Sequence, residues 1–315
     1  MAGFGAITIT AVTTAKRAMD LTGKNMIYNF HIYQFSILRF CLRILMTPIF
    51  ADNFKGGGFG GLAGHSPVFD GSHAAILPVP YDGAVSYKSG AREGPGAIIE
   101  ASCHVELYDT QWNVDNERLG LTLLNEVEPD VCGPEETIAK VETVYEATLD
   151  KTGFVLMLGG DHSLTTAPVR SLARRFEKTL TVVQIDAHTD LRDKYQGSPF
   201  SHACVMRRVI ELAPIVQIGV RSISKVESDF IKTSGHRVYP AWDVAGQTDW
   251  IEPMVDALTE NVYITFDLDG FDPSVAPGVG TPEPGGLSWG DAINIIHAIG
   301  SKRKIVGADV MELRP

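Results

Sequence analysis

An aspartate, a histidine and a second aspartate occupy alternate positions in the segment TVVQIDAHTDLRD, residues 181–193. These residues, Asp186, His188 and Asp190, follow a run of apolar and β-branched residues that is typical of a buried strand. In an extended chain, side chains at alternate positions lie on one face. Two carboxylates on a buried face repel each other and lose their hydration, so we expect a cation between them.

Two other apolar runs also end in residues that can bind metal. GFVLML, residues 153–158, is followed by GGDHS, which contains His162. NVYITF, residues 261–266, is followed by Asp267 and Asp269. In open parallel sheets, ligands bind beyond the carboxyl ends of the strands. The three segments are therefore predicted to bring their polar side chains to one place.

The residue types at these strand ends suit metal-dependent hydrolysis. Carboxylate and imidazole ligands without a thiolate favour a hard or borderline cation, such as Mn²⁺ or Mg²⁺. Two divalent ions about 3.5–4 Å apart form the usual dinuclear hydrolytic site, and water that bridges them becomes a hydroxide nucleophile near neutral pH. The candidate ligands are His162, Asp186, His188, Asp190, Asp267 and Asp269.

Each segment alone also has an ordinary structural interpretation. The Asp-x-His-x-Asp segment could cap a helix or form a surface turn, and Gly-Gly followed by Asp often marks a turn. Asp267 and Asp269 could belong to a calcium-binding type of loop or to a solvated edge. All three segments at the ends of successive apolar strands favour the metal site.

The elements that would position these residues alternate along the chain. Predicted strands are 74–80, 153–158, 179–186, 215–220, 261–269 and 304–313, and predicted helices are 135–151, 167–178 and 288–300. The last helix begins with a capping-box pattern, Ser288 to Asp291, and is predicted to end at Gly300. Uninterrupted apolar strands alternating with helices predict an α/β fold with a parallel sheet that is covered on both faces.

Length and composition limit the classes of function. The 315 residues, 44% hydrophobic and 21% charged, fit one large α/β domain or two ordinary ones. A net charge of −11 argues against nucleic-acid binding, which needs a basic face. The charge is compatible with a small cationic ligand, although many enzymes are acidic for unrelated reasons. The cysteines, Cys41, Cys103, Cys132 and Cys204, are widely spaced, which predicts reduced thiols in a reducing compartment.

Residues 1–70 differ in composition from the rest of the chain. Up to Phe50 there is one acidic residue, Asp20, whereas basic residues are frequent. This composition is typical of an organelle targeting segment. An upstream extension or a wrongly chosen start codon is the alternative explanation. The apolar stretch 25–38 is short for a membrane span, so no membrane partner is predicted. The Gly-rich stretch 55–67 contains a G-x-G-x-x-G match, but it lacks the flanking strand and helix of a nucleotide site.

We therefore expect residues 1–70 to be an extension and flexible linker, partly disordered, and residues 71–315 to be the catalytic domain. The expected location is cytoplasmic, with organelle targeting through the leader as the alternative.

Together the segments GGDHS, DAHTD and FDLDGFDP, the last followed by APGVGTPEPGG, resemble the ureohydrolase family of arginases, agmatinases and related guanidino-compound hydrolases. Residues 78–102 and 307–315 also match, so the resemblance covers about residues 74–315. It implies a three-layer α/β/α sandwich with a mainly parallel sheet, two Mn²⁺ ions per subunit, and a homo-oligomer, either a trimer or a hexamer.

The resemblance also implies individual roles. One Mn²⁺ would be held by His162, Asp186, Asp190 and Asp267, and the other by Asp186, His188, Asp267 and Asp269. Glu312 matches the acidic residue that contacts the guanidinium group, and His202 matches a histidine for proton transfer.

Elementary chemistry agrees with these roles. A guanidinium carbon is a poor electrophile, so its attack needs a strong nucleophile held in line. Glu312 offers a negative charge to the cation, and Asp190 could pass a proton to the departing amine, with His202 as a shuttle. A surface helix cap at His202 and a strand-end ion pair at Glu312 are the alternatives. Cys204 as a thiol nucleophile is disfavoured.

The substrate follows from the branch of the family that the sequence resembles. LRDKYQGSPFSHACVMRR, residues 191–208, lacks the Ser/Asn-containing loop typical of arginases and looks like the agmatinase branch. Hydrolysis of agmatine to putrescine and urea is therefore the leading hypothesis. Guanidinobutyrate is the second candidate substrate, and arginine is the third.

Two other interpretations of the sequence do not involve ureohydrolase activity. A dinuclear metallophosphoesterase would add G-N-H-[D/E] and G-D-x-x-D motifs, and neither is found. The family pattern usually continues for about one helix beyond Glu-x-x-Pro, whereas this sequence stops at Pro315. We therefore also consider an inactive fragment that lacks a C-terminal helix.

Overall fold

The computed structural model describes residues 59–61, 74–116 and 121–315. The predicted basic leader and most of the predicted linker lie outside these residues. Within the linker, Phe59–Gly61 form a short 3-10 turn, η1, and the side chain of Phe59 is buried in the core. Among the described residues, no helix has the length and apolar character needed to cross a bilayer.

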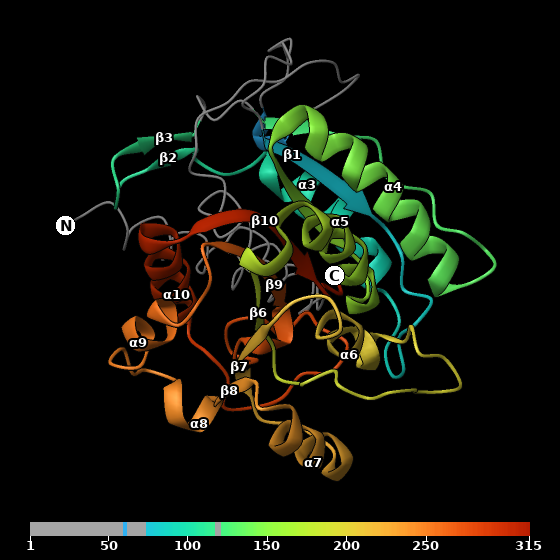
Figure 1. Ribbon diagram of the computed structural model, residues 1–315. Helices are drawn as coiled ribbons and strands as arrows, with labels where there is room; N and C mark the ends of the chain where they lie inside the picture. The colour runs from blue at the N-terminus through green and yellow to red at the C-terminus, as the bar shows by residue number, and fades with distance from the viewer. Residues whose placement is uncertain (1–58, 62–73, 117–120) are drawn as a thin grey trace, which may run out of the picture.

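An eight-stranded sheet with strand order β4-β1-β5-β10-β9-β6-β7-β8 forms the centre of the fold (Figure 1). Every neighbouring pair in it is parallel. The strands are β1 (Ala74–Val79), β4 (Leu121–Leu123), β5 (Phe154–Gly159), β6 (Leu180–Ile185), β7 (Ile215–Val220), β8 (Arg237–Pro240), β9 (Asn261–Asp267) and β10 (Lys304–Met311). A separate hairpin pairs β2 (Tyr108–Asp109) with β3 (Val114–Asp115).

Helices cover both faces of the sheet, which gives the three-layer α/β/α arrangement that the resemblance implied. One core packs the sheet against α3 (Gly94–Ser102), α8 (Ala241–Val244), α9 (Ile251–Asp256) and α10 (Trp289–Lys302). The other core packs it against α4 (Pro134–Thr152), α5 (Thr166–Phe176), α6 (Val205–Val209) and α7 (Lys225–Ser234). Apolar residues at alternate strand positions supply both cores, because successive side chains point to opposite faces.

The predicted strands and helices are present, with shifted ends. The Ser288 capping box of α10 is formed, but the helix continues through Gly300 to Lys302, so the predicted stop was wrong. Gly300 lies within the helix, where the backbone hydrogen bonds of a continuing turn outweigh the weak helix preference of glycine. β9 ends at Asp267 rather than at Asp269, because Leu268–Gly270 turn into the 3-10 helix η7.

The strands are also less apolar than the uninterrupted apolar strands predicted from the sequence. Gln184, Gln217, Thr265 and Asp309 are fully buried inside β6, β7, β9 and β10. These four residues lie side by side in the register of the sheet. They form a polar row across four adjacent strands, and this row directly precedes the strand ends at which the predicted metal ligands lie.

Candidate metal centre

The predicted ligands lie at the carboxyl ends of neighbouring strands. His162 begins η4 (His162–Thr165) after β5, Asp186 directly follows β6, and Asp267 is the last residue of β9. β10 runs between β5 and β9, and Glu312 directly follows it. Because all these strands are parallel, their ends meet at one edge of the sheet, as the sequence predicted.

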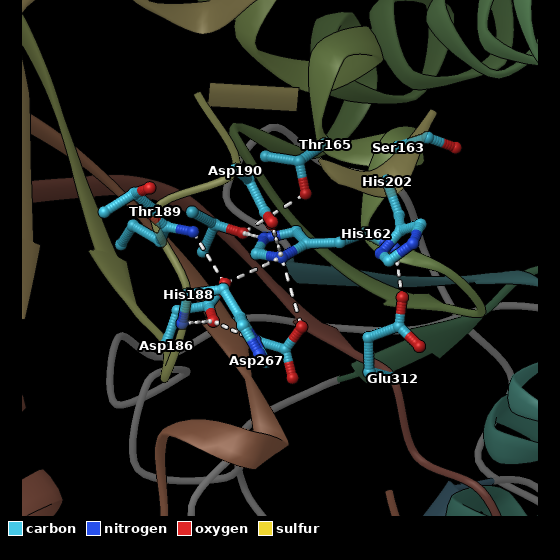
Figure 2. Close-up of polar contacts among 12 residues, drawn as sticks. His162, Ser163, Thr165, Asp186, His188, Thr189, Asp190, His202, Asp267 and Glu312 are labelled. Carbon is cyan, nitrogen blue, oxygen red and sulfur yellow. Dashed lines mark hydrogen bonds and ion pairs between the residues drawn. The ribbon is translucent and has the colours of Figure 1, made fainter. Parts of the chain in front are cut away.

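His162 lies at the middle of the carboxylate cluster (Figure 2). Its Nδ1 atom is 3.1 Å from Asp186 Oδ2, 3.2 Å from Asp190 Oδ2 and 3.2 Å from Asp267 Oδ2. Nδ1 is buried and forms no hydrogen bond within the described part of the chain. A buried nitrogen that faces three carboxylate oxygens has the surroundings of a metal ligand.

The opposite side of the His162 ring explains why Nδ1 faces the carboxylates. Nε2 lies 2.8 Å from Thr265 Oγ1, and the Thr265 hydroxyl donates to Asp309 Oδ1 at 2.6 Å. Because the hydroxyl proton goes to Asp309, the Thr265 oxygen accepts from Nε2–H. In this tautomer Nε2 carries the proton and Nδ1 keeps its lone pair, so Nδ1 can bind a cation.

A second group forms around His188. Its Nδ1 atom lies 3.0 Å from Asp269 Oδ2 and 3.5 Å from Asp186 Oδ1. Two sets of residues have ligand atoms within 4.8 Å of one another, namely His162 with Asp186 and Asp267, and Asp186 with His188 and Asp269. Asp186 belongs to both sets, which is the position of a bridging carboxylate between two ions.

The electrostatics of the cluster favour added positive charge. Burial lowers the pKa of His162, but its contacts with Asp186, Asp190 and Asp267 outweigh burial and raise the pKa well above the ordinary value. Burial raises the pKa of Asp190 to about 7, with a further contribution from the negative charge of Asp186. Burial and the charges of Asp269 and Asp186 also raise the pKa of Asp267. A divalent cation would relieve the same repulsion, so the donor set fits a metal ion.

The backbone around the site is tightly constrained. Asp190 and Glu312 have positive φ values of 51° and 64°, a conformation that is costly for residues other than glycine and that clusters at functional sites. At Gly160, a Cβ atom would lie 1.7 Å from the carbonyl oxygen of Tyr81, so only glycine fits the turn before His162. The carbonyl oxygen of Gly160 accepts the N–H of Glu312 at 2.8 Å.

Glu312 lies against the ligand turn. Its Oε1 atom accepts the backbone N–H of His162 at 2.8 Å, and its side chain lines the cleft together with the predicted metal ligands. Burial and the nearby charge of Asp161 raise the pKa of the Glu312 carboxyl well above its ordinary value. A cationic group in the cleft would favour the ionised form.

His202 lies in η6 (His202–Cys204), also at the cleft. Its Nε2 atom is 3.0 Å from Ser86 Oγ, and its ring meets the ring of Tyr195 edge-on at 6.3 Å. Burial and the charges of His162 and His188 lower the pKa of His202 to about 4. Burial and the charge of Asp190 raise the pKa of the Cys204 thiol to about 11, which disfavours the thiolate nucleophile further.

The cleft has a volume of about 230 Å³, and the charged residues that line it are mostly acidic. The acidic lining residues are Asp190, Glu227, Asp267, Asp269 and Glu312. Among the described lining residues, Arg192 is the single residue with a permanently positive side chain. The Arg192 guanidinium lies over the Tyr195 ring at 4.7 Å and has Nε 3.8 Å from Glu227 Oε2, so part of its charge is compensated.

Sequence reasoning missed one wall of this cleft. Ser222, Ile223 and Ser224 line it, together with Glu227 of α7. The sequence contained a signal for them, because they follow the apolar run of β7 just as the ligands follow β6. Ser224 and Glu227 also form a capping box, and Glu227 accepts the backbone N–H of Leu191 at 3.0 Å, which holds this wall against the ligand turn.

Comparisons with known proteins identify relatives of this chain. The sequence model of the Arginase family matches residues 72–315. The chain is similar to the N(1)-aminopropylagmatine ureohydrolase of Synechocystis, with 38% identity over 254 residues that cover 76% of this chain and 81% of the relative. It is equally similar to the agmatinase of Pyrococcus horikoshii, with 38% identity over 240 residues, 76% of this chain and 82% of the relative.

Solved structures show the same likeness. The agmatine ureohydrolase of Thermoplasma volcanium superposes with a TM-score of 0.71 at 31% identity, covering 83% of this chain and 87% of that protein. The arginase of Bacillus subtilis superposes with a TM-score of 0.67 at 26% identity, covering 78% of this chain and 91% of that protein.

Proposed function

The chain belongs to the arginase family and is an agmatinase-type ureohydrolase, a hydrolase of C–N bonds in linear amidines, and from this premise we propose that it converts agmatine to putrescine and urea with two Mn²⁺ ions. The observation that supports the chemistry is the pair of His/Asp groups that share Asp186. The observation that supports a cationic substrate is the acidic cleft above them.

The proposed ligands are His162, Asp186, Asp190 and Asp267 for one ion and Asp186, His188, Asp267 and Asp269 for the other. The two groups of close ligand atoms support these sets except for Asp190 in the first and Asp267 in the second. Asp190 is supported by its distance of 3.2 Å from His162 Nδ1. Bound divalent cations lower the pKa of water and supply a hydroxide nucleophile near neutral pH. Carboxylate and imidazole donors without a thiolate are compatible with Mn²⁺.

Glu312 is proposed to orient the guanidinium group. Its Oε1 atom is held by the His162 N–H, so the carboxylate has a defined position, and Oε2 can accept an N–H of the substrate. A guanidinium placed between Glu312 and the aspartates of the cleft would have its central carbon directed at the ligand cluster. This orientation would satisfy the proximity requirement for attack on a weak electrophile.

Asp190 and His202 are proposed to handle protons. Asp190 would accept on a carboxylate oxygen the proton that the attacking hydroxide brings and would pass it to the departing amine, so that the proton moves from oxygen to nitrogen. His202 is neutral near pH 7 because burial lowers its pKa, so its ring can relay a proton without holding a positive charge beside the substrate cation. Its hydrogen bond with Ser86 orients the ring toward the cleft.

A second candidate substrate is N(1)-aminopropylagmatine. The similar proteins of Synechocystis and of Thermococcus kodakarensis are named as N(1)-aminopropylagmatine ureohydrolases. Both candidates offer the same guanidinium to Glu312 and differ in the amine beyond it. Guanidinobutyrate and arginine carry a carboxylate that most of the acidic lining would repel, with Arg192 as the exception.

The test is urea release from agmatine, N(1)-aminopropylagmatine, guanidinobutyrate and arginine by Mn²⁺-loaded protein. We expect the highest kcat/KM with agmatine. In the Glu312→Gln variant, which keeps the size of the side chain but removes its charge, kcat/KM for agmatine should fall on the order of 10²-fold or more. A preference for N(1)-aminopropylagmatine would replace the proposed substrate, and no urea from any of the four would refute the proposed activity.

A further inference from the structure

Two buried glutamines lie behind the metal centre in adjacent strands. Gln184 of β6 and Gln217 of β7 are register partners, and neither side chain is exposed to solvent. A buried amide is costly unless its donors and acceptor are satisfied. Apolar residues at these positions would avoid that cost, so the hydrogen bonds of the two amides need an explanation.

The amide of Gln184 contacts a predicted metal ligand directly. Its Nε2 atom donates to Asp186 Oδ2 at 2.6 Å. The amide of Gln217 donates to two acceptors, Gln184 Oε1 and, at 2.7 Å, the backbone carbonyl oxygen of Thr189. Thr189 lies between the predicted ligands His188 and Asp190. The two glutamines therefore hold both the Asp186 carboxylate and the backbone of the turn that follows it.

The chain of hydrogen bonds continues to the edge of the sheet. Gln217 Oε1 lies 2.9 Å from His236 Nε2, and His236 Nδ1 lies 2.7 Å from Ser234 Oγ. An ionised Asp186 can only accept, so Gln184 must turn its NH₂ group toward it. Gln184 Oε1 then accepts from Gln217, and Gln217 Oε1 accepts from His236. Each amide has one orientation that satisfies the whole chain.

We propose that Gln184 and Gln217 are positioning residues that set the metal affinity of the site. Asp186 is shared by both potential metal groups, so its carboxylate plane must suit two ions at once. The hydrogen bond from Gln184 restricts rotation of that plane, and the bond from Gln217 to Thr189 restricts the turn that presents His188 and Asp190. Hydrogen bonds to the ligands of a metal commonly tune its affinity in this way.

The inference rests on the metal-binding part of the proposed function and is independent of the substrate. A purely structural role for the two glutamines makes a different prediction. In that case their replacement would lower the stability of the metal-free protein and leave the metal affinity of the folded protein unchanged.

The test measures Mn²⁺ dissociation constants by competition with a fluorescent chelator, with no substrate present, and thermal unfolding of the same metal-free samples. Gln217→Leu and Gln184→Leu are each expected to weaken Mn²⁺ binding about 10- to 100-fold. The fold-loss of Mn²⁺ affinity in the double variant is expected to be smaller than the product of the fold-losses in the two single variants, because Gln217 acts partly through Gln184.

Thr122→Val is the matched control. Thr122 is a buried strand residue in β4, and its hydroxyl has no hydrogen-bond partner among the described residues. This variant is expected to keep Mn²⁺ affinity within about twofold of the wild type. If Gln217→Leu does not fold, His236→Leu removes the outer partner of Gln217 at a half-buried position and is expected to weaken binding severalfold.

A folded Gln217→Leu protein with wild-type Mn²⁺ affinity would overturn the inference, even if it unfolded at a lower temperature. Wild-type protein that binds no Mn²⁺ would overturn it as well. Wild-type protein that binds Mn²⁺ but releases no urea would refute the proposed activity and leave the positioning role intact, so the two failures are distinguishable.

Discussion

At the scale of single residues, two histidines in the same buried site have opposite pKa shifts because their neighbours differ. Three carboxylate oxygens surround Nδ1 of His162, and they raise its affinity for a cation. His202 lies within the same cleft but faces Ser86 rather than a carboxylate, and burial lowers its pKa to about 4. Partners within hydrogen-bond distance, rather than the residue type, explain why we propose one histidine as a metal ligand and the other as a neutral proton relay.

The lowered pKa of His202 predicts a pH dependence of stability. Between the folded value of about 4 and the ordinary value of 6.5, the unfolded chain binds a proton at His202 that the folded protein does not bind. The free energy of unfolding therefore falls as the pH drops from 6.5, by about 2 kcal/mol at pH 5. His202→Gln should remove this contribution.

The measurement is urea denaturation of the wild type and His202→Gln at a series of pH values. The difference between their free energies of unfolding should change by about 2 kcal/mol between pH 6.5 and pH 5 in favour of the variant. A difference that stays constant over that range would show that the His202 pKa is not lowered in the folded protein.

At the scale of elements, the site depends on tight turns at the ends of parallel strands. The turn after β5 passes so close to Tyr81 that Gly160 leaves no space for a Cβ atom. In the same turn, the carbonyl oxygen of Gly160 accepts the backbone N–H of Glu312 at the end of β10. The backbone N–H of His162 donates to the Glu312 carboxylate. Two strand ends are therefore coupled through one glycine.

Gly160→Ala is expected to force this turn away from Tyr81 and to disturb His162 and Glu312 together. The expected cost is about 1–3 kcal/mol of stability, with weaker Mn²⁺ binding in the folded variant. Gly96→Ala is the matched control, because a Cβ atom at this position of α3 would meet nothing within 4 Å. It should be neutral or stabilising by up to about 1 kcal/mol. Chemical denaturation tests both variants, and equal stabilities for the two would contradict the steric argument.

At the scale of the whole molecule, metal binding and folding are linked. Four buried aspartates and two histidines come from three strand ends that are far apart in sequence, so the unfolded chain cannot present them together. Without a cation their mutual repulsion opposes folding, and a ligand that binds only the folded state stabilises it.

Mn²⁺ is therefore expected to raise the unfolding temperature. At a free concentration of 100 times the dissociation constant, the stabilisation is about 2.7 kcal/mol, which corresponds to roughly 5–10 °C for a domain of this size. Asp186→Asn removes the carboxylate shared by both groups and should lose most of the shift. Differential scanning calorimetry with and without Mn²⁺ measures this, and an equal shift in the variant would show that Asp186 does not bridge.

The sequence by itself determined the ligand types, the parallel α/β class and the strand ends at which the candidate ligands lie. These features are local, because the side-chain period of a strand and the residues that follow it can be read within one segment. The tertiary structure alone decided that Gln184 lies beside Gln217, that Thr265 lies beside Asp309, and that residues 222–224 and Glu227 form a wall of the cleft. The reason is that neighbours across a sheet follow from the order of its strands, and here the last strand of the chain lies between β5 and β9.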